Sequence, residues 1–172
     1  MESRLILQNI VRFAVLTLVQ ILILNNINIS GYAIPYLYLL FILMLPTGMG
    51  KIAMLLAAFV CGLAIDVFSN MLGFHTFSCT MVAFARILFA DRILTRNEPV
   101  VISTPSIYTV KTQYFIGYLL VLTAIFYLTF FSLELFDSHG FWRLLLSITL
   151  STLLTVVLAL ISQILFMKRP HE

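Results

Sequence analysis

Three charged side chains lie inside long apolar runs of the sequence: Arg12, Asp66 and Arg86. A charge at the centre of a membrane-spanning helix costs about 2.5–3.5 kcal/mol on insertion scales, so each needs a compensating role. For Asp66, aspartyl catalysis would require a second carboxylate, because one must act as a base while the other stays protonated. The carboxylates expected at a suitable depth, Glu134 and Asp137, stand in no recognisable catalytic motif. The sequence also contains no glycine-rich serine elbow and no zinc-type histidine spacing, so we predict that the chain is not an enzyme.

Polar residues that we expect near Asp66 point to another chemistry, the binding of a small molecule. Such a site needs polar groups that converge on one cavity open to the outside. The candidates for its lining are Asn25, Asn26, Asn28, Asp66, Asn70 and His75. The alternative is that the stretch "NNINIS" is a solvated loop and that Asp66 has a structural role. Two cysteines, Cys61 and Cys79, lie in apolar runs, where a thiol behaves as a small hydrophobe, and we expect no metal or cofactor.

The composition places these residues in a membrane protein. The chain has 172 residues, of which 62% are hydrophobic and 10% are charged, whereas a soluble domain is about 45–50% apolar and about 25% charged. A transmembrane helix needs roughly 20 apolar residues, so there is room for about six spans and little else. We therefore predict an all-α polytopic protein with a single integral membrane domain over residues 1–172. Its basic residues are scattered singly, which argues against a nucleic-acid partner.

The apolar runs predict where the spans lie. They cover about residues 5–24, 35–45, 51–68, 74–90, 113–135 and 141–167, and a hydrophilic connector covers 91–112. The second run precedes "LPTGMG" and is too short to cross unaided, so it is either a tilted helix extended by its flanks or a partial, re-entrant element. The first run could be a signal peptide, but "NNINIS" makes a poor cleavage site, and we expect the helix to be retained.

Basic residues predict the orientation, because they are enriched in cytoplasmic segments. With both termini cytoplasmic, the inner segments hold Arg4, Lys51, Arg92, Arg96, Lys111, Lys168 and Arg169, and the outer segments hold Arg143 alone. We therefore predict cytoplasmic N- and C-termini. In the connector, Arg92, Arg96 and Lys111 are candidates for contact with anionic lipid or with a protein partner.

Depth along the helices separates the three intramembrane charges. At a rise of 1.5 Å per residue, Asp66 lies roughly 22 Å from Lys51 and so near the outer boundary. Arg12 and Arg86 are expected near the inner end, where they either snorkel to the interface or serve a function. Asp66 is instead predicted to accept hydrogen bonds from the connector after its span, where Gly73 permits a positive φ. On this interpretation the two residues fasten the hairpin of the third and fourth spans, and the alternative is a polar cavity wall.

Small residues recur at helical spacing in the third span: Ala53, Ala57 and Cys61, with Ala58 and Gly62 on the adjacent row. Small side chains let helix backbones approach closely. We favour packing within the bundle over an interface with a partner or a second copy. The hydroxyl stripe of the sixth span, formed by Ser147, Ser151 and Thr155, is likewise expected to serve packing.

The stretch "GLAIDVFSNMLGFH" resembles the signature of the rod shape-determining protein MreD family. The positions that carry the resemblance are Gly62, Leu63, Asp66, Leu72, Gly73 and His75. Chain length, the cluster of spans and the short second span also fit, so the resemblance covers the whole chain. Of these positions, Gly62, Asp66, Leu72 and Gly73 are taken as the family motif, to which no established chemistry belongs.

The resemblance implies a fold similar to that of the substrate-binding components of ECF vitamin transporters. It also implies a non-enzymatic scaffold in the bacterial inner membrane that supports cell shape and lateral peptidoglycan synthesis. The implied partners are MreC, the glycosyltransferase RodA, a class B penicillin-binding transpeptidase and the actin-like MreB. Because the suspected fold is shared, a small-molecule-binding transporter subunit is the alternative. The small-residue face of the third span is a candidate groove for the membrane helix of MreC.

Overall fold

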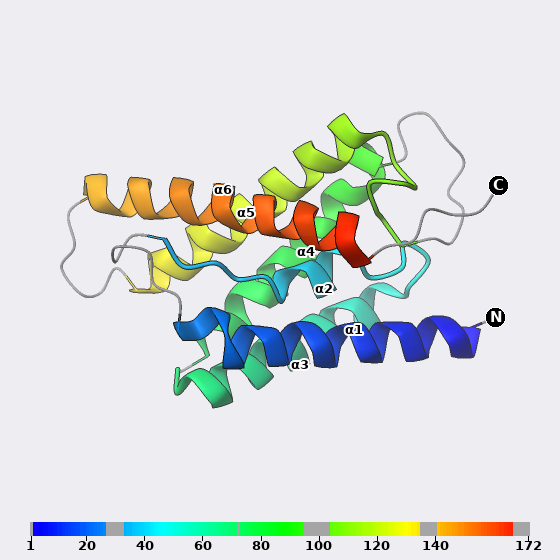
Figure 1. The fold of residues 1–172 in the computed structure, drawn as a ribbon, viewed down its shortest axis with the longest axis horizontal. Helices are drawn as coiled ribbons and strands as arrows, with labels where there is room; N and C mark the ends of the chain where they lie inside the picture. The colour runs from blue at the N-terminus through cyan, green and yellow to red at the C-terminus, as the bar shows by residue number, and fades with distance from the viewer. Residues whose placement is uncertain (1, 27–32, 72, 95–103, 135–140, 167–172) are drawn as a thin grey trace.

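The computed structural model describes residues 2–26, 33–71, 73–94, 104–134 and 141–166, and its fold is all-helical (Figure 1). The long helices are α1 (Glu2–Leu22), α3 (Lys51–Ser69), α4 (Phe74–Leu94), α5 (Thr112–Glu134) and α6 (Phe141–Phe166). The short ones are the 3₁₀ turn η1 (Leu24–Asn26) and α2 (Leu39–Leu43). Each long helix begins and ends within four residues of a predicted span, because long apolar runs leave few alternatives to a helix.

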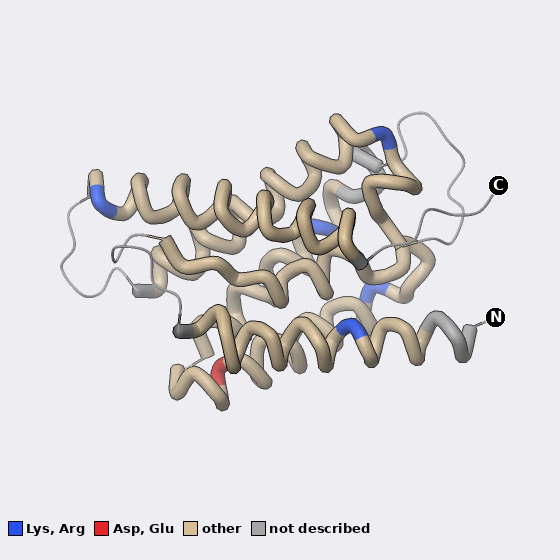
Figure 2. Tube along the Cα trace, viewed as in Figure 1, with Lys and Arg blue, Asp and Glu red and all other residues tan. Residues whose placement is uncertain are grey.

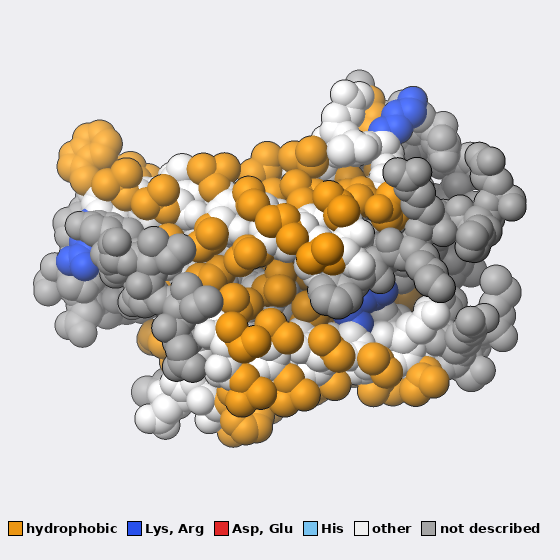
Figure 3. All heavy atoms as spheres, viewed as in Figure 1, with side chains coloured by type: hydrophobic (Ala, Val, Ile, Leu, Met, Phe, Trp, Pro, Cys, Tyr) orange, Lys and Arg blue, Asp and Glu red, His pale blue; other side chains and the backbone are white. Residues whose placement is uncertain are grey.

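Three of these helices are long and apolar enough to cross a membrane: Lys51–Ser69, Thr112–Leu133 and Trp142–Leu165. The apolar parts of α1 and α4 are shorter, Ile6–Leu22 and Phe74–Phe89. Figure 3 shows hydrophobic side chains over the outer faces of α1 and α6, and in Figure 2 few positions of the chain carry a charge. An apolar exterior of this extent suits lipid rather than water. The chain is therefore a helical membrane protein.

The helices follow one another back and forth along the long axis of the molecule (Figure 1). Neighbours in sequence pack side by side, α3 on α4, α4 on α5 and α5 on α6, while α1 packs on α3 and α2. One end of the molecule holds the close of α3 and the start of α4, and we call it the Asp66 end. The other holds the start of α3 and is called the Lys51 end.

The second predicted span is not a transmembrane helix. Residues 33–45 are called the central segment. They run without a helix as far as a turn at Leu37 and Tyr38, which leads into the single short helix α2. The segment runs between α1 and α6 from the Asp66 end toward the Lys51 end (Figure 1). Tyr38, Leu39 and Ile42 are fully buried in it. It is thus a partial helical element, as one of the two predicted alternatives has it, and not a tilted helix that crosses by itself. Backbone without helical bonds is tolerated at membrane depth only inside protein.

The turn between α3 and α4 contains the positive φ that the sequence predicts at Gly73, where φ is 86°. Asn70 ends α3 in the left-handed region with φ 54°. Its backbone N–H and that of Met71 both donate to the carbonyl of Asp66, which closes the helix. Leu72, the remaining motif position in this turn, lies outside the described residues.

The predicted connector is shorter and less solvated than its composition indicates. Helix α4 continues to Leu94, and the described part of the connector from Thr104 packs back on the bundle. Pro105 and Ser106 are buried, and the backbone N–H of Ile107 donates to Gln163 Oε1 at 3.1 Å. This part of the connector is therefore held by α6 rather than free beside the lipid headgroups.

Candidate functional site

The closest approach of α3 to α4 occurs at Gly62. A Cβ atom built there would lie 2.5 Å from the Cα of Thr76 and 2.7 Å from the carbonyl oxygen of His75. Both contacts are with backbone, which cannot move aside as a side chain can. Glycine at this position therefore sets the spacing of the two helices.

Asp66 lies one turn further along the same face of α3 and caps the start of α4. Its Oδ1 accepts from the backbone N–H of His75 at 3.0 Å, and its Oδ2 accepts from the N–H and the hydroxyl of Thr76 at 2.8 and 2.5 Å. The side chain is 3% exposed. An anion at a helix N-terminus is favourable, so α4 compensates for the poor position of Asp66 at the end of its own helix. The predicted hydrogen bonds are present, although they come from the first turn of α4 rather than from the loop.

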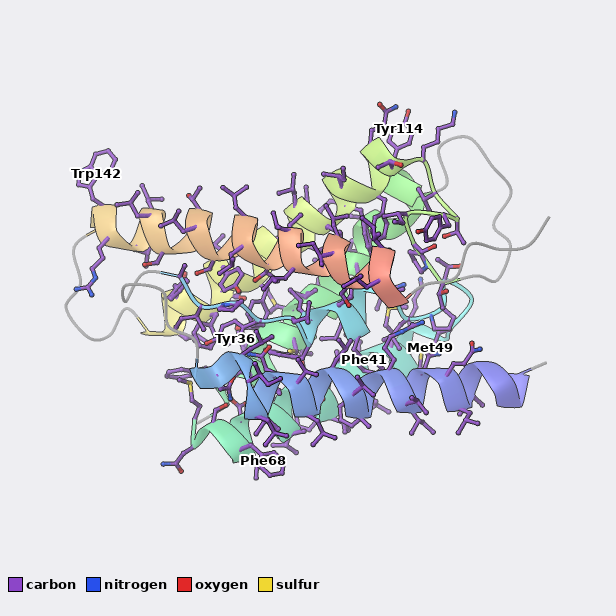
Figure 4. All side chains as sticks on the ribbon, in the orientation of Figure 1. Tyr36, Phe41, Met49, Phe68, Tyr114 and Trp142 are labelled. Atoms are coloured by element: carbon purple, nitrogen blue, oxygen red, sulfur yellow. The ribbon has the colours of Figure 1, made fainter. Side chains whose placement is uncertain are left out.

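His75 links this capping site to the central segment. Its Nδ1 lies 2.8 Å from the hydroxyl of Tyr38, which also accepts a weak bond from Cys79 Sγ at 3.7 Å. The imidazole ring is 4.8 Å from the ring of Tyr36 and 4.7 Å from that of Phe130. Figure 4 shows Tyr36 pointing into the molecule, whereas Phe68 and Trp142 point away from it. The motif residues thus lie against a packed aromatic core.

Three of the six residues considered for a small-molecule cavity, Asn25, Asp66 and His75, bond to other residues of the protein. Asn25 accepts from Gln20 Nε2 at 2.9 Å and donates to Ser69 Oγ at 3.0 Å, which ties α1 to α3. Asp66 and His75 bond within the protein as given above. Asn70 is exposed, the side chain of Asn26 is not described, and Asn28 lies outside the described residues.

At the Asp66 end, the part of the central segment before α2 receives hydrogen bonds from three helices. The hydroxyl of Tyr127 donates to the carbonyl of Ile34 at 2.6 Å, and Gln20 Nε2 donates to that of Pro35 at 3.1 Å. The backbone N–H groups bond to side chains as follows: Ile34 to Ser151 (3.2 Å), Tyr36 to Tyr127 and Thr155 (3.1 and 3.2 Å), and Leu37 to Gln20 Oε1 (2.9 Å). Side chains thereby replace the backbone partners that a chain without a helix lacks.

At the Lys51 end, two arginines and a tyrosine donate to carbonyls in the last turn of α2 and directly after it. Arg86 donates to the carbonyls of Ile42, at 2.7 Å, and Leu45, and Arg12 donates to that of Met44 at 3.3 Å. The hydroxyl of Tyr118 donates to the carbonyl of Leu43 at 2.8 Å. Cations are favourable at a helix C-terminus, where carbonyls lack intrahelical partners.

The expectation that Arg86 snorkels is wrong. The residue is 1% exposed, and its guanidinium is turned to the central segment. Arg12 is half-buried and donates to Asn9 Oδ1 and to the carbonyl of Met44, so its snorkelling stays a prediction. For Arg86 the reason is that α2 ends close by, where Ile42 and Leu45 present buried carbonyls.

The small-residue row of α3 serves packing, as predicted, where it is buried. Ala58 and Cys61 are fully buried, and Gly62 touches α4. Ala57 is half-buried and Ala53 is exposed. A partner groove on this face is therefore excluded for the buried members of the row.

The basic residues of the connector are described in part. Lys111 is exposed just before α5. Arg92 belongs to the last turns of α4, but its side chain is not described, and Arg96 lies outside the described residues. The same holds for the two carboxylates weighed for catalysis, since the side chain of Glu134 is not described and Asp137 lies outside the described residues.

Sequence reasoning missed Gln20, Tyr118, Tyr127 and Gln163. Each is a polar side chain near the middle or end of an apolar helix, and each now bonds to backbone outside its own helix. The signal available was the short second run itself, since a short crossing predicts that neighbouring helices carry donors and acceptors for it.

Replacing Gly62 by alanine is expected to lower the free energy of unfolding by about 1–3 kcal/mol, because the new methyl group forces α3 and α4 apart. Gly117→Ala is the matched control, since nothing lies within 4 Å of a Cβ there. In a helix interior alanine is favoured by about 1 kcal/mol, so the control should be neutral or stabilised. Thermal unfolding in detergent measures both, and equal effects of the two substitutions would contradict the close approach.

Comparison of the chain with family models, curated proteins and solved structures gives no match. Its function must therefore be inferred from its own residues.

Proposed function

We propose that this chain is a non-enzymatic scaffold subunit of the bacterial rod elongation complex, of the MreD type. It lies in the inner membrane as a multi-pass protein with cytoplasmic termini. It supports cell shape and lateral peptidoglycan synthesis by binding MreC, RodA and a class B penicillin-binding transpeptidase. The fold expected on this proposal is similar to that of the ECF substrate-binding components.

The observation that supports this proposal best is that the motif residues form one joint. Gly62 sets the distance between α3 and α4, Asp66 caps α4 one turn later, and Gly73 supplies the positive φ between them. The spacing in the sequence therefore has a physical reason. A motif whose spacing is explained by helix packing and capping specifies the shape of the joint rather than a reaction.

The use of the polar side chains also favours a scaffold. Asp66, His75 and Arg86 are buried and bonded within the protein, and the surface between the two ends is largely apolar. A subunit that presents fixed surfaces to several partners gains from an interior held this firmly. A transporter subunit would instead keep convergent polar groups open for its ligand.

Affinity purification from membranes tests the proposal. After a wash in mild detergent, the tagged chain is expected to retain MreC in an amount nearly equal to its own. An unrelated membrane protein with the same tag provides the control. Recovery of a small molecule such as a vitamin, with no MreC, would reject the scaffold in favour of the transporter alternative.

Replacing Arg92 and Arg96 together by alanine is expected to weaken binding of cytoplasmic partners several-fold, since a basic patch loses two charges. Insertion into the membrane should be unchanged. Lys51→Ala removes one exposed charge at the start of α3 and serves as the control. Unchanged retention of every cytoplasmic partner by the double variant would show that the connector is only a basic tether.

A further inference from the structure

The central segment cannot be a stable crossing by itself. Of residues 33–45, only Leu39–Leu43 are helical, far fewer than the roughly 20 residues of an independent membrane helix. Its part before α2 would leave backbone N–H and C=O groups unpaired in lipid. The segment therefore needs its protein partners before it can stay at this depth.

Most of those partners are synthesised after it. Gln20 and Arg12 of α1 precede the segment, but Arg86, Tyr118, Tyr127, Ser151 and Thr155 belong to α4, α5 and α6. The carbonyl of Ile34 is bound by Tyr127 of α5, and that of Ile42 is bound by Arg86 of α4 in addition to the backbone N–H of Leu45. While the segment leaves the ribosome, these donors do not yet exist.

The segment is joined to α1 along its length. Gln20 bonds to both Pro35 and Leu37 near the Asp66 end, the rings of Phe13 and Phe41 lie 5.3 Å apart, and Arg12 bonds to Met44 near the Lys51 end. Since α1 and α3 both run from the Lys51 end to the Asp66 end, the segment must cross back whenever α1 has crossed (Figure 1). The two crossings are therefore coupled, and α1 with the segment forms an N-terminal hairpin.

We infer that the N-terminal hairpin, described over residues 2–26 and 33–45, docks as one unit and last, onto a bundle that α3 to α6 have already formed. The joint of α3 and α4 carries the cap of Asp66 and the contact at Gly62, neither of which involves the hairpin. That bundle contains all three helices that are long enough to cross alone. This inference is independent of the proposed function.

The order of burial tests the inference in the full chain. The native Cys61 and Cys79 are first changed to alanine. Single cysteines are then placed at Thr17 in α1, at Leu37 in the central segment and at Ala58 in α3. Ala58 lies one turn before Gly62, on the row that faces α4. The chain is synthesised with lipid vesicles and pulsed with a membrane-impermeant maleimide. Protection of Ala58→Cys is expected first, and protection of Thr17→Cys and Leu37→Cys together, at least about threefold later.

Two outcomes would overturn the inference. Simultaneous protection of all three reporters would mean that the chain assembles in a single step, and early protection of Thr17→Cys with Ala58→Cys would mean that α1 does not wait for the segment. If a reporter never becomes protected, the half-buried positions Val19, Ile34 and Ala57 replace the three.

A second measurement removes the donors of the later helices. The variant Tyr127→Phe with Thr155→Val is expected to raise labelling of Leu37→Cys about tenfold at equilibrium, since an unpaired buried group shifts the equilibrium by about that factor. Ala58→Cys should be labelled as before. The matched control is Thr129→Val with Thr149→Val, whose hydroxyls bond carbonyls of their own helices. Equal labelling in the two double variants would overturn the inference.

Discussion

Arg86→Met is expected to lower the free energy of unfolding by about 3 kcal/mol, the largest effect of the substitutions considered. The guanidinium donates to the carbonyls of Ile42 and Leu45, and no water reaches these groups in the interior. Without the arginine, the Leu45 carbonyl loses this donor, and the Ile42 carbonyl keeps only the 3.4 Å bond from the backbone N–H of Leu45. A buried carbonyl left unpaired costs about 1–3 kcal/mol. Methionine regains part of this, because the variant no longer buries a charge. The loss remains dominant because the two carbonyls are backbone and stay in place.

Arg86→Lys separates charge from geometry. An ammonium retains the positive charge but lacks the planar fork that reaches both carbonyls, so an intermediate loss is expected. Lys51→Met removes an exposed charge at the same end and should change stability little. Unfolding in detergent, followed by circular dichroism, measures all three. If Arg86→Met were as stable as the original chain, the carbonyls would have to find other donors.

The long helices could be predicted because their apolar length leaves little choice. For a run such as 141–167, any conformation other than a helix would leave backbone groups unpaired in lipid. The observed α6, Phe141–Phe166, accordingly ends within one residue of the prediction. The same reasoning located α3 and its turn, since Gly73 marks where the chain reverses.

The central segment could not be predicted from its own residues. Its run of leucine, phenylalanine and isoleucine suits a helix as well as a buried extended chain. What decides the conformation is the supply of donors and acceptors from Gln20, Tyr127 and Thr155, which are distant in the sequence. Hydropathy counts these side chains as minor interruptions of apolar helices, although each pairs with backbone of the segment.

The depth of a residue along its helix and the direction of its side chain are predicted from different features of the sequence. Counting residues placed Arg86 toward the Lys51 end of α4, where the carbonyls that it binds lie. It did not reveal which way the side chain points, because the free carbonyls at the end of α2 and after it depend on where that helix ends. For Asp66 the hydrogen bonds of the side chain were also predicted, because the partners of its carboxylate lie within ten residues along the chain.

Asp66→Asn is expected to lower the free energy of unfolding by about 2–3 kcal/mol and to loosen the joint of α3 and α4. The carboxylate uses both oxygens to accept bonds from His75 and Thr76. An asparagine has one acceptor oxygen, so its amide group would face a backbone N–H, and one donor would stay unpaired. The favourable interaction of the anion with the start of α4 is also lost. Ser69→Ala, which removes the neighbouring bond to Asn25, is the control and should cost less.

A double-mutant cycle with Thr76→Val assigns this loss to the cap. Thr76→Val removes only the hydroxyl that Asp66 binds and leaves the backbone N–H in place. If the two residues act as one unit, the double variant should be more stable than the sum of the single losses predicts, by about 1 kcal/mol. Strict additivity would separate the two residues. An unchanged melting temperature in Asp66→Asn would return the carboxylate to the role of a cavity wall, since a group that lines a cavity can be neutralised without unpairing the start of α4.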